Sequence, residues 1–284
     1  MSELISTSAI SAQDQVQVHP SAVVDPLAEL ESGVVIGPGA IVGPDVKIGA
    51  NCWIGPNVVL DGRLTMGARN RVFPGACIGL EPQDLKYRGA STEVVIGADN
   101  TIRECVTINR ATDEGEQTRI GNQNLLMAYC HLGHNCELGD GIVMSNSVQA
   151  AGHVVIEDRA VIGGCLGLHQ FVHVGQLAMV GGMTRVDRDV PPFCLAEGHP
   201  GRLRGLNRVG LRRSRLDQKD KGGELRQLQD IWNLIYRSGH VLNEGLQLAR
   251  KETLLPASNH LCSFLEASMG AGRRGPMPVI ASNR

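Results

Sequence analysis

Residues 30–48 read LESGVVIGPGAIVGPDVKI, with an aliphatic residue at every sixth position. The same spacing continues in one register from residue 18 to residue 186. The positions that depart from it are Asp84, Ala90, Glu114 and Ala150. A period of six matches neither the helical repeat of about 3.6 nor the strand alternation of about two. It is typical of a hexapeptide-repeat parallel β-helix, in which each hexad forms a short strand and a turn.

The composition fits such a coil and excludes several other classes of protein. Aromatic residues make up only 3% of the chain, and 35 glycines are available for turns. The net charge of −2 gives no overall basis for binding nucleic acid or an anionic membrane. The chain has no apolar run long enough for an integral membrane segment, and the polar segment 1–17 does not resemble a signal peptide.

The eight cysteines are expected to be reduced structural thiols. They form no C-x-x-C pair, and Cys52, Cys130 and Cys136 occupy the small inward position of their hexads. A free thiol behaves there as a small hydrophobe. Because structural disulfides are rare in reducing compartments, this cysteine usage favours a cytoplasmic protein.

Changes in the repeat define the expected organisation of the chain. It comprises an N-terminal tail over 1–17, a β-helix over 18–200, an α-helical domain over 201–269 and a flexible tail over 270–284. Interruptions at 81–95 and 110–118 preserve the six-residue register. They are therefore predicted to be loops extruded from the coils.

The C-terminal domain follows a different period. From Gly223 the apolar residues fall on one helical face, and Gly239 is a plausible end of that helix. Further helices are expected over 240–252 and 258–268. Because the end of a β-helix needs a cap, we expect these helices to cover it.

The register also predicts a cluster of histidines. Three hexads close one triangular coil, so residues 18 apart should lie on adjacent rungs, about 4.8 Å apart. On this basis the following residues gather into one strip on one face of the prism: His131, His134, Gly152, His153, His169 and Gln170.

A histidine beside a glycine amide suggests acyl transfer. A neutral imidazole can deprotonate an attacking hydroxyl, and a backbone N–H can stabilise the developing oxyanion. Other interpretations remain open from spacing alone. Turn histidines are often only solvated, and some proteins of this fold, such as the γ-class carbonic anhydrases, bind zinc through three histidines across a subunit interface.

At these residues the chain resembles the acyl-(acyl-carrier-protein)–UDP-N-acetylglucosamine O-acyltransferases, which begin lipid A biosynthesis. The matching motifs are QDLKY (83–87), RECVTI (103–108), NLLMAYCHLGHNC (124–136), AGHVVI (151–156), HQF (169–171), DVPP (189–192) and LIYRSG (234–239). LIYRSG lies outside the repeat and therefore does not reflect shared hexad bias. The resemblance implies a left-handed β-helix and a homotrimer with sites between subunits. The implied substrates are acyl carrier protein and UDP-N-acetylglucosamine, and we expect no metal or other cofactor.

The resemblance also assigns roles to individual residues. His134 is implied to be the general base toward the glucosamine 3-hydroxyl, and Gly152 the oxyanion donor. The residues implied to bind the substrates are Asp84, Lys86, His131, His153, His169, Gln170, Gly182, His199, Arg212 and Arg213. Among these, Arg212 or Arg213 would meet the nucleotide phosphates, other arginines would meet acidic acyl carrier protein, and Gly182 would permit a long acyl chain.

Three positions depart from the pattern of many relatives. Asn135 replaces an Asp after the proposed base, and its amide can orient an imidazole but stabilises imidazolium less. His199 stands where an Asn is common, and Asn109 where a His is common. None of the three is the proposed base itself.

Alternative functions make different predictions. The related N-acyltransferase of the same pathway carries an additional N-terminal uridine-binding domain, whereas only the short segment 1–17 precedes the first hexad here. A carbonic-anhydrase-like enzyme would contain stoichiometric zinc. A non-catalytic β-helix scaffold would show no turnover and no dependence on His134.

Overall fold

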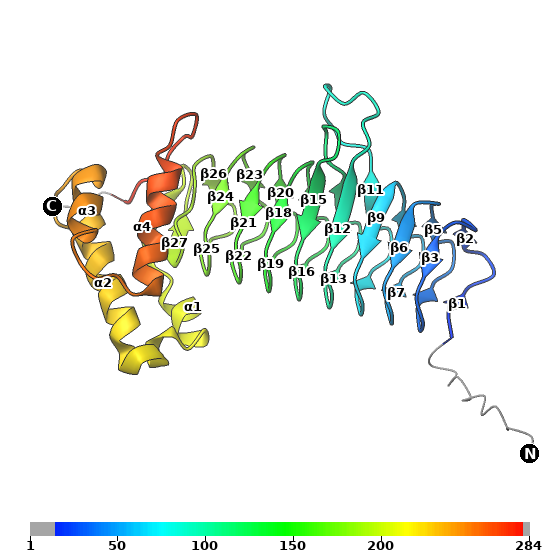
Figure 1. Ribbon diagram of the computed structural model, residues 1–284, viewed down its shortest axis with the longest axis horizontal. Helices are drawn as coiled ribbons and strands as arrows, with labels where there is room; N and C mark the ends of the chain where they lie inside the picture. The colour runs from blue at the N-terminus through cyan, green and yellow to red at the C-terminus, as the bar shows by residue number, and fades with distance from the viewer. Residues whose placement is uncertain (1–14, 281–284) are drawn as a thin grey trace, which may run out of the picture.

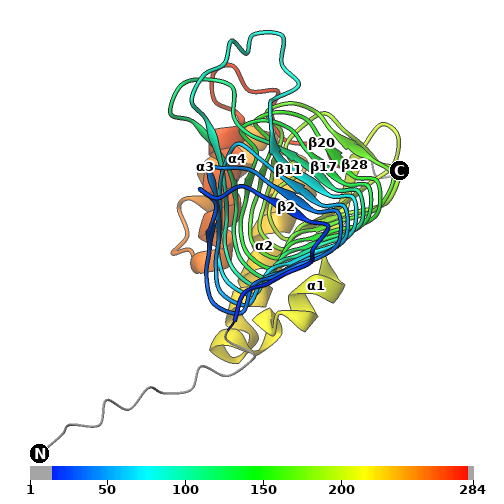
Figure 2. The same ribbon diagram turned by 90° about the vertical axis from the view of Figure 1, so that its right-hand side faces the viewer.

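The computed structural model describes residues 15–280, which form a triangular prism of stacked coils with helices at one end (Figure 1). The view along the prism shows the triangular cross-section (Figure 2). Each coil supplies strands to three parallel sheets, and the predicted β-helix is therefore confirmed. Most of the predicted N-terminal tail, and residues 281–284 of the predicted C-terminal tail, lie outside the described residues.

The chain enters the three sheets in turn within each coil. The first sheet comprises β1 (Gln17–Val18), β4 (Val35–Ile36), β7 (Trp53–Ile54), β10 (Arg71–Val72), β13 (Thr101–Ile102), β16 (Leu125–Leu126), β19 (Val143–Met144), β22 (Val161–Ile162), β25 (Met179–Val180), β27 (Cys194–Glu197) and β28 (Arg202–Leu206). The second comprises β2 (Val23–Val24), β5 (Ile41–Val42), β8 (Val59–Leu60), β11 (Cys77–Leu80), β14 (Thr107–Asn109), β17 (His131–Leu132), β20 (Gln149–Ala150), β23 (Gly167–Leu168) and β26 (Arg185–Val186). The third comprises β3 (Glu29–Leu30), β6 (Val46–Ile48), β9 (Arg63–Met66), β12 (Glu93–Ile96), β15 (Gln117–Ile120), β18 (Glu137–Leu138), β21 (Val155–Ile156) and β24 (His173–Val174).

Strand pairing follows the predicted register. Leu132 pairs with Ala150, and Ala150 pairs with Leu168, so partners on adjacent rungs are separated by three hexads. Strands β10 and β13 pair across the first extruded loop, and β14 and β17 pair across the second. In each of these pairings the two partners lie farther apart in sequence than three hexads, and the extra length is a whole number of hexads. The insertions therefore leave the inward-facing positions unchanged. The loops span residues 81–92 and 110–116, because β12 and β15 begin earlier than expected.

The repeating aliphatic residues form the core. From Ile36 to Val186 those in the hexad register are at most 4% exposed, apart from the three positions within the loops. Burying a side chain of this size contributes about 2 kcal/mol. The inward cysteines are also buried, all eight cysteines are free thiols, and burial raises the pKa of Cys136 to about 12.

The helical cap begins later than expected. The first sheet continues past residue 200, because β28 pairs antiparallel with β27. The helices are α1 (Arg208–Arg213), the short 3-10 helix η1 (Leu216–Gly222), α2 (Gly223–Tyr236), α3 (Leu242–Ala249) and α4 (Pro256–Ser268). The predicted apolar face of α2 is buried at Leu228, Ile231, Trp232 and Ile235. Helix α4 begins two residues before its predicted start, with Pro256 in its first turn.

The segment after α4 does not behave as the predicted flexible tail. Pro276 bridges to Asp189 and Val279 bridges to Leu203, so the segment lies against the end of the β-helix. The side chain of Met277 is only 1% exposed. This apolar burial and the backbone hydrogen bonds hold the segment up to residue 280, and for this part of the chain the prediction is wrong.

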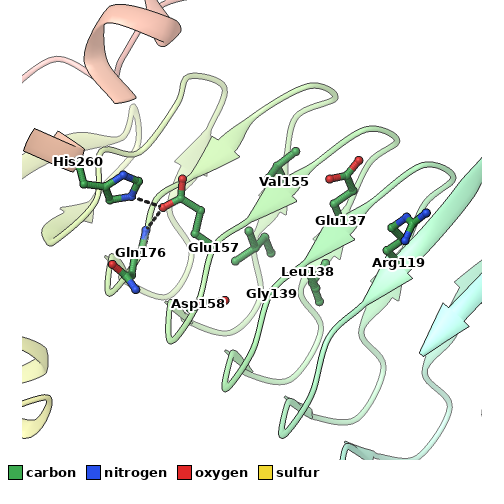
Figure 3. Close-up of a pocket in the computed structure, with 10 residues that line it drawn as sticks. Arg119, Glu137, Leu138, Gly139, Val155, Glu157, Asp158, Gln176 and His260 are labelled. Carbon is green, nitrogen blue, oxygen red and sulfur yellow. Dashed lines mark hydrogen bonds and ion pairs between the residues drawn. The ribbon is translucent and has the colours of Figure 1, made fainter. Parts of the chain in front are cut away.

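A carboxylate on the third sheet joins the β-helix to α4. Glu157 accepts hydrogen bonds from the backbone N–H of Gln176 at 2.7 Å and from His260 Nε2 at 2.6 Å (Figure 3). It also lies 2.9 Å from His173 Nε2. Burial by itself would raise the pKa of Glu157. The hydrogen bonds from His173 and His260 outweigh that effect and lower the pKa to about 2. The carboxylate therefore stabilises the docked helix in its ionised form.

We expect Glu157→Gln to lower the free energy of unfolding by about 2 kcal/mol near neutral pH, since it weakens hydrogen bonds to a charged group. The pKa of Glu157 is depressed in the folded state, so this stabilisation is present above the ordinary value of 4.5 and is lost as the pH falls toward 2. Urea denaturation across this range measures the difference. Glu137→Gln, which alters an exposed carboxylate on the same sheet, is the control and should show no such pH dependence.

Candidate active site

The predicted histidine strip and both extruded loops share one corner of the prism. Loops 81–92 and 110–116 leave the second sheet and return to the third, and they project together in the view along the axis (Figure 2). His134, Gly152 and Gln170 occupy the turns after the next strands of the second sheet, β17, β20 and β23. We call this edge of the prism, with its two loops, the site corner. The loops thus stand beside the predicted strip.

His134 is held at the site corner by contacts on both sides of its ring. Its side chain is 11% exposed, and Nδ1 lies 2.9 Å from Oδ1 of Asn135. The other nitrogen, Nε2, lies 3.7 Å from Oδ2 of Asp84 in the first loop. An Nδ1–H that donates to this amide oxygen leaves the lone pair of Nε2 free, as a general base requires.

Gly152 lies directly over the ring of His134. A Cβ at this position would meet His134 Nε2 at 2.4 Å, so the absence of a side chain keeps this nitrogen accessible. Equivalent turn positions elsewhere hold Pro38, Pro56 and Pro74, which have no amide hydrogen. Among the described residues the amide of Gly152 likewise donates to no backbone acceptor. It is therefore available to an external oxyanion.

Two further imidazoles lie near His134. The ring of His153 meets His134 edge-on at a centroid distance of 5.0 Å and stacks on Phe171 at 4.7 Å. Burial, and then the neighbouring His134, lower the pKa of His153. His131 lies on strand β17 rather than at the corner; its Nδ1 is 2.7 Å from the hydroxyl oxygen of Thr107, and burial lowers its pKa. Both imidazoles are therefore neutral near pH 7.

The first loop brings Asp84 and Lys86 to the same corner. Oδ1 of Asp84 accepts the backbone N–H of Lys86 at 2.9 Å. This hydrogen bond, and then the proximity of His134, lower the pKa of Asp84. Asn109 holds the start of the loop, since its side chain donates to the carbonyl oxygen of Glu81 at 2.6 Å. Asn109, a departure from the family pattern, therefore has a structural role in this chain.

His169 and Gln170 lie farther along the corner, next to the C-terminal segment. Nδ1 of His169 is 3.0 Å from the carbonyl oxygen of Gln170, and Nε2 is 3.1 Å from Nη2 of Arg274. Together with Arg273 and Arg188 they line a pocket of about 360 Å³. The contact with Arg274 was not predicted, because the segment was expected to be flexible.

The remaining predicted residues lie elsewhere on the chain. Gly182 follows β25 at the corner between the first and second sheets. Arg213, on α1, lines a groove with Asp158, which follows a strand of the third sheet. Arg212 is exposed on α1, and His199 is exposed in the turn between β27 and β28. One chain alone does not bring Gly182, His199 and the two arginines to His134.

The groove in Figure 3 is also separate from the histidine strip. It runs along the third sheet past Arg119 and Glu137, and its end at α4 carries Glu157 and His260. Within residues 15–280, no three His, Cys, Asp or Glu side chains converge in an arrangement suited to a metal ion. In the same residues, no helix is both long and apolar enough to cross a membrane.

A turn histidine with an accessible Nε2, a glycine amide beside it and a hexapeptide-repeat β-helix point to the hexapeptide-repeat acyltransferases as a class. Residues 189–277 match the family model described as Udp N-acetylglucosamine O-acyltransferase, domain 2. The chain is 46% identical over 261 residues to the acyl-[acyl-carrier-protein]–UDP-N-acetylglucosamine O-acyltransferase of Verminephrobacter eiseniae, covering 91% of this chain and 98% of that protein. It is 52% identical over 222 residues to the corresponding Synechocystis protein, covering 78% and 79%.

A solved structure gives the same result. The crystal structure of UDP-N-acetylglucosamine O-acyltransferase from Moraxella catarrhalis matches with a TM-score of 0.83 and 37% identity, over 92% of this chain and 99% of that one. The chain belongs to the family of acyl-[acyl-carrier-protein]–UDP-N-acetylglucosamine O-acyltransferases. The expected left-handed course of its β-helix is confirmed with the family.

We expect Gly152→Ala to reduce acyltransferase activity about a hundredfold, a loss typical of a disrupted oxyanion site. The added methyl group would meet His134 Nε2 at 2.4 Å and displace the base or the substrate. Gly167→Ala is the matched control, since a Cβ there meets nothing closer than 3.9 Å. Both variants should keep the wild-type melting temperature, and equal activity of the two would contradict this account of Gly152.

Proposed function

We propose that this chain transfers a β-hydroxyacyl group from acyl carrier protein to the 3-hydroxyl of UDP-N-acetylglucosamine, the first step of lipid A biosynthesis. The observation that carries the proposal is the position of His134 Nε2 beside Gly152 in a chain of this family. The names of the relatives supply the two substrates. The arrangement of His134 and Gly152 at the site corner supports acyl transfer between these two substrates.

The proposed reaction is direct attack on the thioester. His134 Nε2 removes the proton from the sugar hydroxyl as its oxygen bonds to the acyl carbonyl carbon. The negative charge that develops on the carbonyl oxygen is stabilised by the amide of Gly152. When the tetrahedral intermediate collapses, the C–S bond breaks and the proton held by His134 passes to the leaving thiolate. No covalent enzyme intermediate is needed.

The other residues of the site corner would position the sugar nucleotide. Neutral His131 and His153 can donate or accept hydrogen bonds to hydroxyls, as suits a sugar. Asp84 remains ionised and faces His134, where it can accept a hydrogen bond from a sugar hydroxyl and stabilise the imidazolium that forms. Lys86, His169 and Gln170 would extend the same surface along the corner.

We further propose that the active form is a homotrimer with its sites between subunits. Gly182, His199, Arg212 and Arg213 lie away from His134 within one chain, so a neighbouring subunit would have to bring them to the cleft. Large apolar side chains at the turns also support an interface, since Tyr129, Phe171 and Met183 are 61%, 55% and 76% exposed.

The remaining roles follow from the same assembly. Arg212 or Arg213 would meet the nucleotide phosphates, and other arginines of the 202–215 stretch would meet acidic acyl carrier protein. Gly182 would leave room for a long acyl chain, with Met183 beside it. The free thiols throughout the chain fit a protein that works in the reducing cytoplasm.

We expect His134→Ala to lower the transfer rate by about a hundredfold or more, in keeping with general-base contributions of about 10²–10⁴. The trimer should persist, because the aliphatic residues that form the core and keep the register are unchanged. Steady-state assays with purified acyl carrier protein and UDP-N-acetylglucosamine, together with light scattering, test both points. Near-normal turnover in this variant would contradict the mechanism.

The same preparation separates the alternatives. Acylation of an amino sugar nucleotide in place of the 3-hydroxyl acceptor would indicate the related N-acyltransferase. Stoichiometric zinc in the purified trimer, with activity lost on chelation, would indicate a metalloenzyme. Absence of turnover with acyl groups of several lengths would leave a scaffold protein.

A further inference from the structure

The side chain behind His134 has its own network of partners. Oδ1 of Asn135 faces His134 Nδ1 at 2.9 Å and accepts the backbone N–H of Thr112 at 3.2 Å. Nδ2 of Asn135 donates to Oε2 of Glu116 at 2.6 Å. The Asn135 backbone N–H donates to the hydroxyl of Thr118 at 2.9 Å. Two of these partners, Thr112 and Glu116, belong to the second extruded loop.

These contacts determine which way the amide points. A carboxylate can only accept a hydrogen bond, so the NH₂ group of Asn135 must face Glu116. A backbone N–H can only donate, so the carbonyl oxygen must face Thr112. Both ends therefore require the same orientation, and Oδ1 is presented to His134 as an acceptor. A neutral His134 ring then carries its proton on Nδ1 and keeps Nε2 free.

We propose that Glu116, acting through Asn135, is a positioning residue that holds His134 in the Nδ1–H tautomer. The inference rests on the proposed role of His134 as the base. Glu116 does not touch the reacting atoms; it locks the amide, and the amide selects the tautomer. Without Glu116 the amide could turn its NH₂ group toward Nδ1, which would place the imidazole proton on Nε2, the nitrogen that must be free.

Charge repulsion explains why an amide at position 135 is compatible with the carboxylate of Glu116. An Asp at position 135 would place a second carboxylate about 2.6 Å from Glu116, and two like charges at this separation do not both ionise readily. Asn135 avoids this conflict, while Glu116 keeps a negative charge one side chain behind the imidazole. An amide stabilises the imidazolium less than a carboxylate would. The carboxylate of Glu116 behind the amide partly compensates for this difference.

The other carboxylates near His134, Asp84 and Asp113, do not contact the Asn135 amide that selects the tautomer. Asp84 faces Nε2 at 3.7 Å, on the opposite side of the ring. His153 meets the ring edge-on. Asp113, in the second loop, interacts electrostatically with His153. Glu116 also lies 3.4 Å from the backbone N–H of Asp113, so a purely structural role in shaping the loop is the competing explanation. The experiment must distinguish the two.

The test is a pair of single variants and their combination, assayed for kcat and KM over a range of pH. We expect Asn135→Asp alone to lower kcat about tenfold, a fraction of a general-base contribution, with KM little changed. Adding Glu116→Gln should restore kcat to within about threefold of wild type, because the Gln amide donates to the new carboxylate that Glu116 had repelled. The acidic limb of the pH profile should shift in the single variant and return in the double variant.

A spectroscopic readout separates this proposal from the proposed function. In ¹⁵N-histidine-labelled protein, neutral His134 should be protonated at Nδ1, and Glu116→Ala should produce a mixture of tautomers. Glu114→Gln is the control, since Glu114 belongs to the same loop but accepts the backbone N–H of Ser91. That variant should leave the His134 tautomer unchanged, whereas a general loosening of the loop would disturb the tautomer in both variants.

Two results would overturn the proposal. One is a double variant no more active than Asn135→Asp, and the other is an unchanged tautomer in Glu116→Ala. If the tautomer responds as expected but His134→Ala still turns over normally, the positioning network stands and the proposed catalytic role of His134 fails.

Discussion

The constraint on which the whole molecule depends is the closure of each coil after three hexads. Backbone hydrogen bonds between rungs pair strand residues that occupy the same position in their hexads. Leu132, for example, pairs with Ile108 on one side and with Ala150 on the other. The inward row of aliphatic side chains is buried only if this register is kept. The two insertions obey the same rule, because each adds whole hexads between a strand of the second sheet and the next strand of the third, and the pairing beyond it stays in register.

This closure also creates the site. Since both insertions leave from the corner that carries His134, the loops stand beside the histidine strip without disturbing the core. The coils supply the histidines, and the loops contribute further contacts: Asp84 from the first, Thr112 and Glu116 from the second. The stacked coils therefore position His134 and the amide of Gly152, while side chains on the loops place charged groups around them.

Asn135 illustrates how a departure from a family pattern can be compensated. In sequence it appears as a loss, since an amide supports imidazolium less well than a carboxylate. In the structure it is one half of a pair with Glu116, and the pair restores both orientation and negative charge behind His134. The C-terminal segment behaves similarly: a stretch rich in Gly, Pro and Arg packs on the β-helix and brings Arg274 to His169.

The six-residue period by itself determined the coil, the inward positions and the neighbourhood of His134, Gly152 and Gln170, because stacking at a constant offset converts sequence distance into spatial position. The helical period of α2 was equally readable. The partners Asp84 and Glu116 lie in loops without a period, so only the folded chain decided which atoms they approach. The same is true of the end of the first sheet at β28 and of the docked C-terminal segment, which are held by pairings with no local signal. Register is a local, repeating property of the chain, whereas loop and terminal contacts depend on which surfaces the finished prism leaves open.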